Sequence, residues 1–335
     1  MSILNGYQRT EAQICATLCN IAYQEENSTN YPVIKNAINT ALSDPKALYI
    51  GANWRLCWLG ISPDFGNLMY LAADTTQPGT YAIVHRGTDW NYLDDVVQDM
   101  DVYNTSRLSF LNPPHPDIYV AKGAMDGLTV LQQMKDTPDS LSAHTGLVGI
   151  LDCIKSLSSP VGSPLNIYIT GHSLGGALAT LFTTWLLEML DQEAASLPPV
   201  FVKTYSIASP TIGNVAYVNY YNSKMTSPGV IPFQGYRIHN LQDLVPAAFA
   251  DLAGLPDNGI PLGLMMKEVL KTAVLAVTGT LKLEGLAYVP AGVNMPLLNN
   301  PPTLQPPCTA EASSLKEYGC WVGYEHSLDT YLSLI

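Results

Sequence analysis

A short strand pattern, a serine flanked by glycines and a long apolar helix pattern follow one another near the middle of the chain. The strand pattern is Leu165–Thr170, rich in β-branched and aromatic residues, and the helix pattern runs from Leu174 to Leu190. Between them lies Gly171-His172-Ser173-Leu174-Gly175, a G-x-S-x-G sequence. A serine on so sharp a strand-to-helix turn needs neighbours without Cβ atoms, which the glycines provide. The segment therefore predicts an α/β fold in which Ser173 sits on a tight turn at the end of a strand.

The rest of the chain alternates between helix-like and strand-like segments, which favours a largely parallel sheet flanked by helices. Periodicity predicts helices over Glu11–Ala22, Met125–Met134 and His144–Leu157. It predicts further strands over Asn67–Ala72, Tyr81–His85, Val200–Ser206 and Tyr236–His239. No internal repeat is visible. We expect one domain over residues 1–335, with a cap or insertion at about 247–310.

Composition and charge exclude several classes of protein. Hydrophobic residues make up 47% of the chain and charged residues 13%, which rules out a disordered chain. The net charge of −12 argues against a nucleic-acid surface and against adsorption to anionic lipid by a basic patch. No run approaches the ~18 apolar residues of a membrane span. Arg9 and Glu11 interrupt any apolar core of a secretory signal, so we expect a cytoplasmic protein as written, or a secreted one if a leader was removed.

The cysteines do not form a metal-binding or scaffold pattern. The chain contains no CxxC pair, and its six cysteines are too few for a disulfide scaffold at this length. Cys15 and Cys19 share one helix face and are expected to be buried small hydrophobes. Cys308 and Cys320 either close a short surface loop or remain free thiols.

Ser173 is either a nucleophile or a residue of a fortuitous turn, and as a nucleophile it requires a base. In the G-x-S-x-G architecture the chain order is serine, acid, histidine, and only His239 and His326 follow Ser173. His239 lies inside a predicted strand, and the acids before it lie on or near a helix that runs away from the serine. His326 is therefore the candidate base, with a surface histidine on a terminal helix as the alternative interpretation.

The candidate for the carboxylate that orients His326 is Asp243. The aspartates between the serine and the histidine are Asp191, Asp243, Asp251 and Asp257. Asp243 follows the predicted strand Tyr236–His239 by a few residues, which places it at the carboxyl end of the sheet, where catalytic groups gather in α/β folds. The other two loop aspartates have no strand directly before them. The alternative is that Asp243 is a solvated loop residue.

Six blocks in order, from about Tyr81 to the C-terminus, resemble the class 3 lipases, the fungal-lipase-like branch of the α/β-hydrolases. The blocks are Val84-His85-Arg86-Gly87-Thr88, Lys122-Gly123, Gly171–Gly176, Ser209–Asn214, Asp243-Leu244-Val245-Pro246 and His326-Ser327-Leu328. One departure is Ala124, where the family carries an aromatic residue after Lys-Gly. The resemblance implies an α/β-hydrolase fold with a helical or loop insertion before the catalytic histidine.

The resemblance also implies an activity. It identifies the chain as a serine carboxylic-ester hydrolase, a lipase or esterase that cleaves lipid esters such as acylglycerols through an acyl-enzyme. The backbone N–H groups of Thr88 and Leu174 would form its oxyanion hole, and the chemistry needs neither a metal nor an organic cofactor. Transient contact with a lipid interface would follow. The alternatives are a phospholipase A1 or feruloyl-type esterase with the same triad and, from another class, a non-catalytic binding protein of this fold.

Two segments are candidates for covering the site. Asp89–Asp101 follows the block where the family has its lid, but its aspartates indicate a solvated acidic face rather than an oily lid or a calcium loop. Leu262–Val277 carries an apolar stripe at helical spacing. We expect this second segment to line an acyl pocket, with an ordinary core helix as the alternative.

Overall fold

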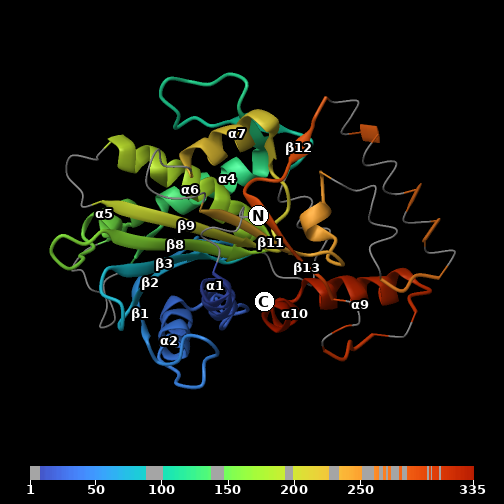
Figure 1. The fold of residues 1–335 in the computed structure, drawn as a ribbon, viewed down its shortest axis with the longest axis horizontal. Coiled ribbons are helices and arrows are strands. Elements are labelled where there is room, and N and C mark those ends of the chain that lie inside the picture. Colours follow the sequence, from blue (N-terminus) through green and yellow to red (C-terminus); the bar gives the residue numbers. More distant parts are fainter. Residues whose placement is uncertain are drawn as a thin grey trace.

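A seven-stranded sheet forms the centre of the computed structural model (Figure 1). The structure describes residues 8–87, 101–136, 147–192, 199–225, 234–250, 260–263, 285–299 and 311–335, with short pieces at 267–268, 271–272, 279–280, 302 and 304–308. The strands of the sheet, in spatial order, are β1 (Trp54–Ile61), β2 (Leu68–Asp74), β3 (Thr80–His85), β8 (Leu165–His172), β9 (Val200–Ile207), β11 (Gly235–Asn240) and β13 (Val293–Leu297).

The sheet is mixed but mostly parallel. Strands β1, β2 and β3 pair in antiparallel fashion, whereas the pairs from β3 through β8, β9 and β11 to β13 are all parallel. The carboxyl ends of the parallel strands therefore meet at one edge of the sheet. Ser173 directly follows β8 and Asp243 follows β11 by three residues, so both lie at this edge.

Helices cover both faces of the sheet (Figure 1). One face is covered by α1 (Arg9–Ile21), α2 (Tyr31–Leu42) and α10 (Leu328–Leu334), and the other by α4 (Lys122–Gln133), α5 (Ile150–Lys155), α6 (Leu174–Gln192) and α7 (Val215–Lys224). Two separate clusters of buried apolar side chains result, one on each face. All seven residues of β2 are buried, as expected for a strand covered on both sides.

Smaller elements accompany the central sheet. Short strands β4 (Thr105–Arg107), β5 (Tyr119–Ala121), β10 (Gly213–Asn214) and β12 (Tyr288–Val289) form a second sheet, and β6 (Lys135–Asp136) pairs with β7 (Val148–Gly149). A 3₁₀ turn, η1 (Val245–Ala247), follows the aspartate, and α9 (Leu315–His326) ends at the candidate base. Within the described ranges, no helix is both long and apolar enough to cross a membrane.

A third apolar cluster lies away from the two sheet faces and includes Trp321 and Tyr324 of α9. A disulfide joins Cys308 to Cys320, so the loop between them is closed rather than carrying free thiols. Cys15 and Cys19 are both free and fully buried on α1, as the sequence predicts.

Most predicted elements are confirmed, but one helix begins later than predicted and several elements were not predicted. The helix predicted over His144–Leu157 begins only at Ile150, because Val148–Gly149 pairs with Lys135–Asp136 instead; residues 144–146 lie outside the described residues. The predicted strand inventory omits two strands of the central sheet, β1 and β13, and the helix inventory omits α2, α7, α9 and α10. Most of the Asp89–Asp101 segment and most of Leu262–Val277 lie outside the described residues.

Candidate active site

Ser173 occupies a backbone conformation that residues other than glycine seldom adopt. Its φ is +58°, in the left-handed region, and it stands between the last residue of β8 and the first residue of α6. A Cβ at Gly171 would lie 2.1 Å from the Gly175 carbonyl oxygen, and one at Gly175 would lie 2.3 Å from that of His85. The glycines are therefore required by close backbone approach on both sides of the turn. This strained turn is the geometry of a nucleophile elbow.

His326 and Asp243 form a buried pair at the same edge of the sheet. His326 Nδ1 lies 2.5 Å from Asp243 Oδ2, and both side chains are fully buried. Because the carboxylate accepts this bond, Nδ1 carries the proton and the lone pair of the imidazole resides on Nε2. The structure thus brings together the two residues that the sequence predicts as base and orienting acid.

Two further hydrogen bonds fix the carboxylate. The backbone N–H of Val245 donates to Asp243 Oδ1 at 3.0 Å, and the Tyr331 hydroxyl donates to Oδ2 at 2.8 Å. The Arg237 side chain donates to the carbonyl of Pro246 in the 3₁₀ turn η1, which anchors the loop that carries Asp243. Sequence reasoning missed Tyr331, although it lies only five residues after His326.

Burial has the largest effect on the pKa values of Asp243 and His326. It raises the pKa of Asp243 above its ordinary value, against the opposing hydrogen bonds from Val245 and Tyr331. It holds the pKa of His326 well below the usual range. The imidazole is therefore neutral at neutral pH, which is the state that a general base requires.

His172, the residue before the serine, connects the elbow to the candidate base. His172 Nε2 lies 2.8 Å from the backbone carbonyl oxygen of His326, and the centroids of the two rings are 4.6 Å apart. The Tyr23 hydroxyl lies 3.3 Å from His172 Nδ1 and accepts a hydrogen bond from the Gly87 N–H at 3.1 Å. Strand β8, the C-terminal helix α9 and the end of β3 are thereby held in one arrangement around Ser173.

The predicted oxyanion hole is described in part. Leu174 is the first residue of α6, and the first amides of a helix have no intrahelical acceptor and point toward negative charge. Thr88, the other predicted donor, lies outside the described residues, whereas its neighbour Gly87 is described and buried. Asp251 and Asp257 also lie outside the described residues, and Asp191 pairs instead with Lys224 at 2.8 Å.

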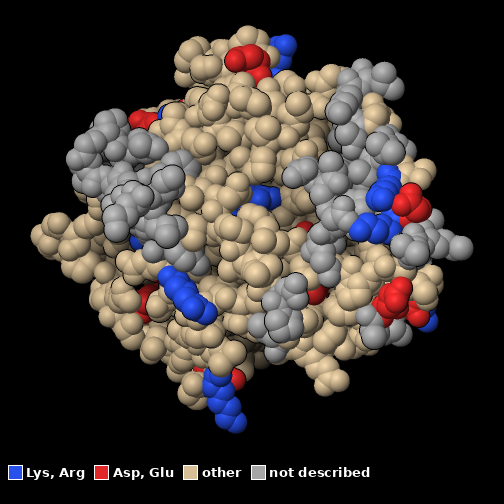
Figure 2. All heavy atoms as spheres, turned by 45° about the vertical axis from the view of Figure 1, so that its right-hand side comes forward, with Lys and Arg blue, Asp and Glu red and all other residues tan. Residues whose placement is uncertain are grey.

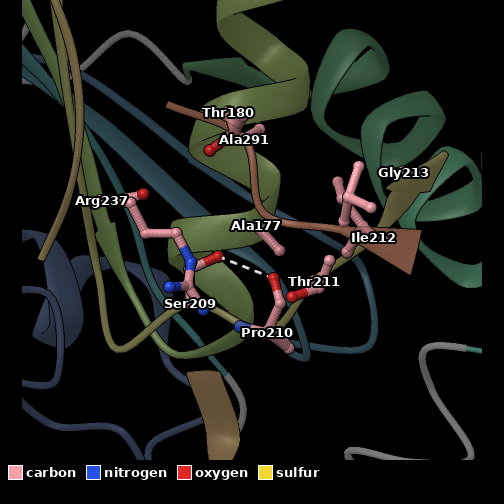
Figure 3. Close-up of a pocket in the computed structure, with 11 residues that line it drawn as sticks. Ala177, Thr180, Ser209, Pro210, Thr211, Ile212, Gly213, Arg237 and Ala291 are labelled. Atoms are coloured by element: carbon pink, nitrogen blue, oxygen red, sulfur yellow. Dashed lines mark hydrogen bonds between the residues drawn. The ribbon is translucent and has the colours of Figure 1, made fainter. Parts of the chain in front are cut away.

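A very small pocket of about 10 Å³ lies next to the first turns of α6 (Figure 3). Ala177 and Thr180 of α6 line one side of it, and Arg237 of β11 lines another. Ser209, whose hydroxyl donates to the carbonyl of Pro210 at 3.0 Å, lines it as well. The lining mixes these polar groups with apolar residues such as Ile212, Val289 and Ala291, and the space is too small for an acyl chain.

A mostly parallel sheet with a serine elbow after one strand and an acid–histidine pair beside it defines the α/β-hydrolase class of fold. The family model described as Lipase (class 3) matches residues 82–252, half of the chain, and the chain belongs to this family. The structure of M37 lipase has the same fold, with a TM-score of 0.72, 22% sequence identity, and 96% of this chain and 91% of that chain covered.

Two plant proteins are similar in sequence. Phospholipase A1-Igamma2, chloroplastic, of Arabidopsis thaliana is 34% identical over 139 residues, which cover 40% of this chain and 24% of that protein. Phospholipase A1-Igamma1, chloroplastic, of the same organism is 27% identical over 159 residues, which cover 42% of this chain and 28% of that protein. The chain matches only about a quarter of the length of these relatives.

Proposed function

We propose that this chain is a serine hydrolase that cleaves the carboxylic esters of lipids through an acyl-enzyme. The observation that carries the proposal is the conjunction of Ser173 at φ +58° with the 2.5 Å contact between His326 and Asp243. A strained serine alone, or a buried acid–histidine pair alone, has structural explanations. Both at one sheet edge, joined through His172, match the requirements of nucleophilic catalysis.

In the proposed reaction Ser173 Oγ attacks the ester carbonyl while its proton passes to His326 Nε2. Asp243 holds the imidazole in the correct tautomer and stabilises the imidazolium. The oxyanion is held by the Leu174 N–H and, by family resemblance, by the Thr88 N–H. The imidazolium then protonates the departing alcohol. A water molecule, activated by His326, attacks the acyl group in the second half of the cycle and releases the carboxylic acid.

Two observations favour lipid esters over small polar esters. The family and the two plant relatives, both named phospholipase A1, point to esters of fatty acids. The face shown in Figure 2 has large uncharged areas between scattered groups of charged side chains. Ser173 is fully buried here, so a substrate reaches it only after part of the cover has moved.

The choice between triacylglycerols and phospholipids calls for a direct comparison of rates. The 34% identity to a protein named phospholipase A1 supports the second class as a specific alternative. Purified enzyme would be assayed on triglyceride emulsions, on phosphatidylcholine vesicles and on feruloyl esters, with acyl chains of increasing length. We expect the two lipid substrates to be hydrolysed and the feruloyl ester to be a poor substrate. The Ser173→Ala variant is the control, and activity retained by that variant would overturn the proposal.

A further inference from the structure

Glu325, the residue before the candidate base, is a buried acid that the proposed reaction does not use. It belongs to the last turn of α9 and is 0% exposed. An ionisable side chain is seldom buried so completely unless it is bonded, because its charged form loses solvation. Its contacts therefore indicate what the carboxylate does there.

Two asparagine side chains hold one oxygen of this carboxylate. Asn240, at the end of β11, donates from Nδ2 to Glu325 Oε2 at 2.7 Å, and Asn299, just after β13, donates to the same oxygen at 2.7 Å. Both asparagines are fully buried. The other oxygen, Oε1, is buried and has no hydrogen-bond partner within the described part of the chain. Glu325 thus connects the last two strands of the sheet to the helix that presents His326.

The backbone at this point is held as well. The last carbonyls of a helix have no intrahelical donor and need partners elsewhere. The Glu325 carbonyl accepts from Asn240 Nδ2 at 3.0 Å, and the next carbonyl, that of His326, lies 2.8 Å from His172 Nε2. Two successive peptide groups, at and directly before the candidate base, are therefore fixed by side chains of the sheet.

The same asparagine reaches the catalytic acid through its backbone. The Asn240 N–H donates to the Tyr331 hydroxyl at 2.9 Å, and that hydroxyl donates to Asp243 Oδ2. Asp243 lies near enough to Glu325 to raise the pKa of its carboxyl, in addition to the larger effect of burial, whereas the two asparagine amides lower it. The titratable groups that face the imidazole are Asp243, which is bonded to Nδ1, and the rings of His172 and Tyr331, whose centroids lie 4.6 and 6.4 Å from that of His326. Behind them, Asp243 interacts with Glu325 and with the cation of Arg237 on β11.

We propose that Glu325 is a positioning residue of the reaction, which fixes His326 through Asn240 and Asn299 and adds a second negative charge near the imidazolium formed during catalysis. The inference rests on the proposed function of Ser173, His326 and Asp243. It adds to that function an acid outside the triad. Such a charge favours the imidazolium over the neutral imidazole, and so favours the transition state over the ground state.

The bonding pattern supplies a variant that separates charge from geometry. In Glu325→Gln the amide oxygen replaces Oε2 and accepts from both asparagines, while the NH₂ group takes the position of the oxygen without a described partner. Glu325→Ala removes both the charge and the bonds. Glu317 is a partly exposed acid on the same helix, and its carboxylate accepts from the hydroxyls of Ser313 and Ser314 at the helix start. It provides the matched control variant Glu317→Gln.

The test measures kcat, KM and the pH dependence of kcat/KM on a soluble ester. For Glu325→Gln we expect KM within about twofold, kcat lower by roughly tenfold, and the acid limb of the profile moved to lower pH, because loss of a nearby negative charge lowers the pKa of the base. Glu325→Ala should lose more, on the order of a hundredfold in kcat, because the histidine is also misplaced. Glu317→Gln should match the wild type in all three measurements.

A wild-type kcat and pH profile in Glu325→Gln would overturn the proposal, and so would an equal profile shift in Glu317→Gln. If Glu325→Ala fails to fold, Asn299→Ala provides a second variant that removes one bond and keeps the charge. It should lower kcat without moving the acid limb, and unchanged kcat would contradict the positioning role. An active Ser173→Ala variant would instead overturn the proposed function, so the two failures are distinguishable.

Discussion

Asp243 receives hydrogen bonds from three different parts of the chain: its own loop, the end of α9 and the start of the last helix. Only one of these donors, His326, would move a proton in the proposed reaction. The other two, Val245 and Tyr331, hold the carboxylate in the orientation in which it binds Nδ1. Asp243 is therefore buried and hydrogen-bonded, and the alternative interpretation of a solvated loop aspartate does not hold.

Asp243→Asn tests this residue directly. The amide preserves size and can still accept one hydrogen bond, but it can hold the imidazole with the proton on the wrong nitrogen. We expect kcat to fall by on the order of 10³- to 10⁴-fold while the circular dichroism spectrum stays unchanged. A folded variant within tenfold of wild-type kcat would show that the acid of the triad is another residue.

At the scale of elements, the sequence predicts the segments that carry the site better than those at the sheet edges. The strand–turn–helix around Ser173 is visible because a short β-branched run, two glycines and a long apolar run adjoin. β13 was missed because its Val-Asn-Met-Pro-Leu sequence contains a proline and only half-buried apolar residues, as an edge strand allows. β1 was missed because its apolar run, Leu56–Leu59, is only four residues long, and so short a run fits a buried helix segment as well as a strand.

Within the site, too, the sequence does not predict contacts between segments that are far apart in the chain. Chain order and strand position were enough to predict Ser173, Asp243 and His326. Tyr23 and Asn240 could not be predicted, because their roles depend on which helix and strand ends meet in space. No local pattern marks a tyrosine at the end of α1 as a neighbour of the elbow.

Two glycines differ in the space around the position that a Cβ atom would take: Gly175 has backbone atoms close to it, whereas Gly319 has no atom within 4 Å. Gly175→Ala would place a Cβ 2.3 Å from the His85 carbonyl oxygen, so either strand β3 or the elbow must shift. A shift of about 1 Å at the elbow can cost ~100-fold in rate, and we expect at least that loss in kcat. Gly319→Ala, in α9, meets no atom within 4 Å and should stabilise the protein by about 0.5–1 kcal/mol. Urea unfolding would give the free energy of unfolding of both variants, and ester hydrolysis would give their kcat. Equal changes of these quantities in the two variants would contradict the packing argument.

The disulfide between Cys308 and Cys320 should contribute measurably to the free energy of unfolding. Cys308 and Cys320 are 12 residues apart, and the bond ties the segment before α9 to the helix itself. Closing a loop of this size restricts the unfolded chain by about 3 kcal/mol. We expect Cys320→Ser to lower the free energy of unfolding by roughly 2–3 kcal/mol. Reductant should lower the free energy of unfolding of the wild type by the same amount and should not change that of the variant. If reductant leaves the free energy of unfolding of the wild type unchanged, the disulfide does not form.

For the molecule as a whole, buried neutral histidines set a lower limit to the pH range of stability. His85 is fully buried against Phe182, neither of its ring nitrogens has a partner among the described residues, and burial lowers its pKa to about 3. In the unfolded chain its pKa is ~6.5, so the unfolded state binds a proton first as the pH falls. The contribution of His85 to stability is therefore complete above about pH 6.5 and is lost progressively toward pH 3.

His85→Leu removes this contribution. Between pH 7 and pH 5 the wild type should lose about 2 kcal/mol more free energy of unfolding than the variant. The raised pKa of Asp243 acts in the opposite direction, but it does so in both proteins and cancels in the comparison. Urea unfolding at the two pH values measures the difference, with exposed His115→Leu as the control. Equal losses in wild type and His85→Leu would contradict the assignment.

The central claim is that Ser173 is a nucleophile activated by His326, and covalent labelling tests it most directly. The enzyme would be incubated with an alkyl p-nitrophenyl phosphonate, digested, and examined by mass spectrometry. We expect one phosphonyl adduct per chain, on the peptide that contains Ser173, with no adduct in Ser173→Ala and labelling slower by at least about 10³-fold in His326→Ala. An adduct on another residue, or hydrolysis that continues without any adduct, would contradict it.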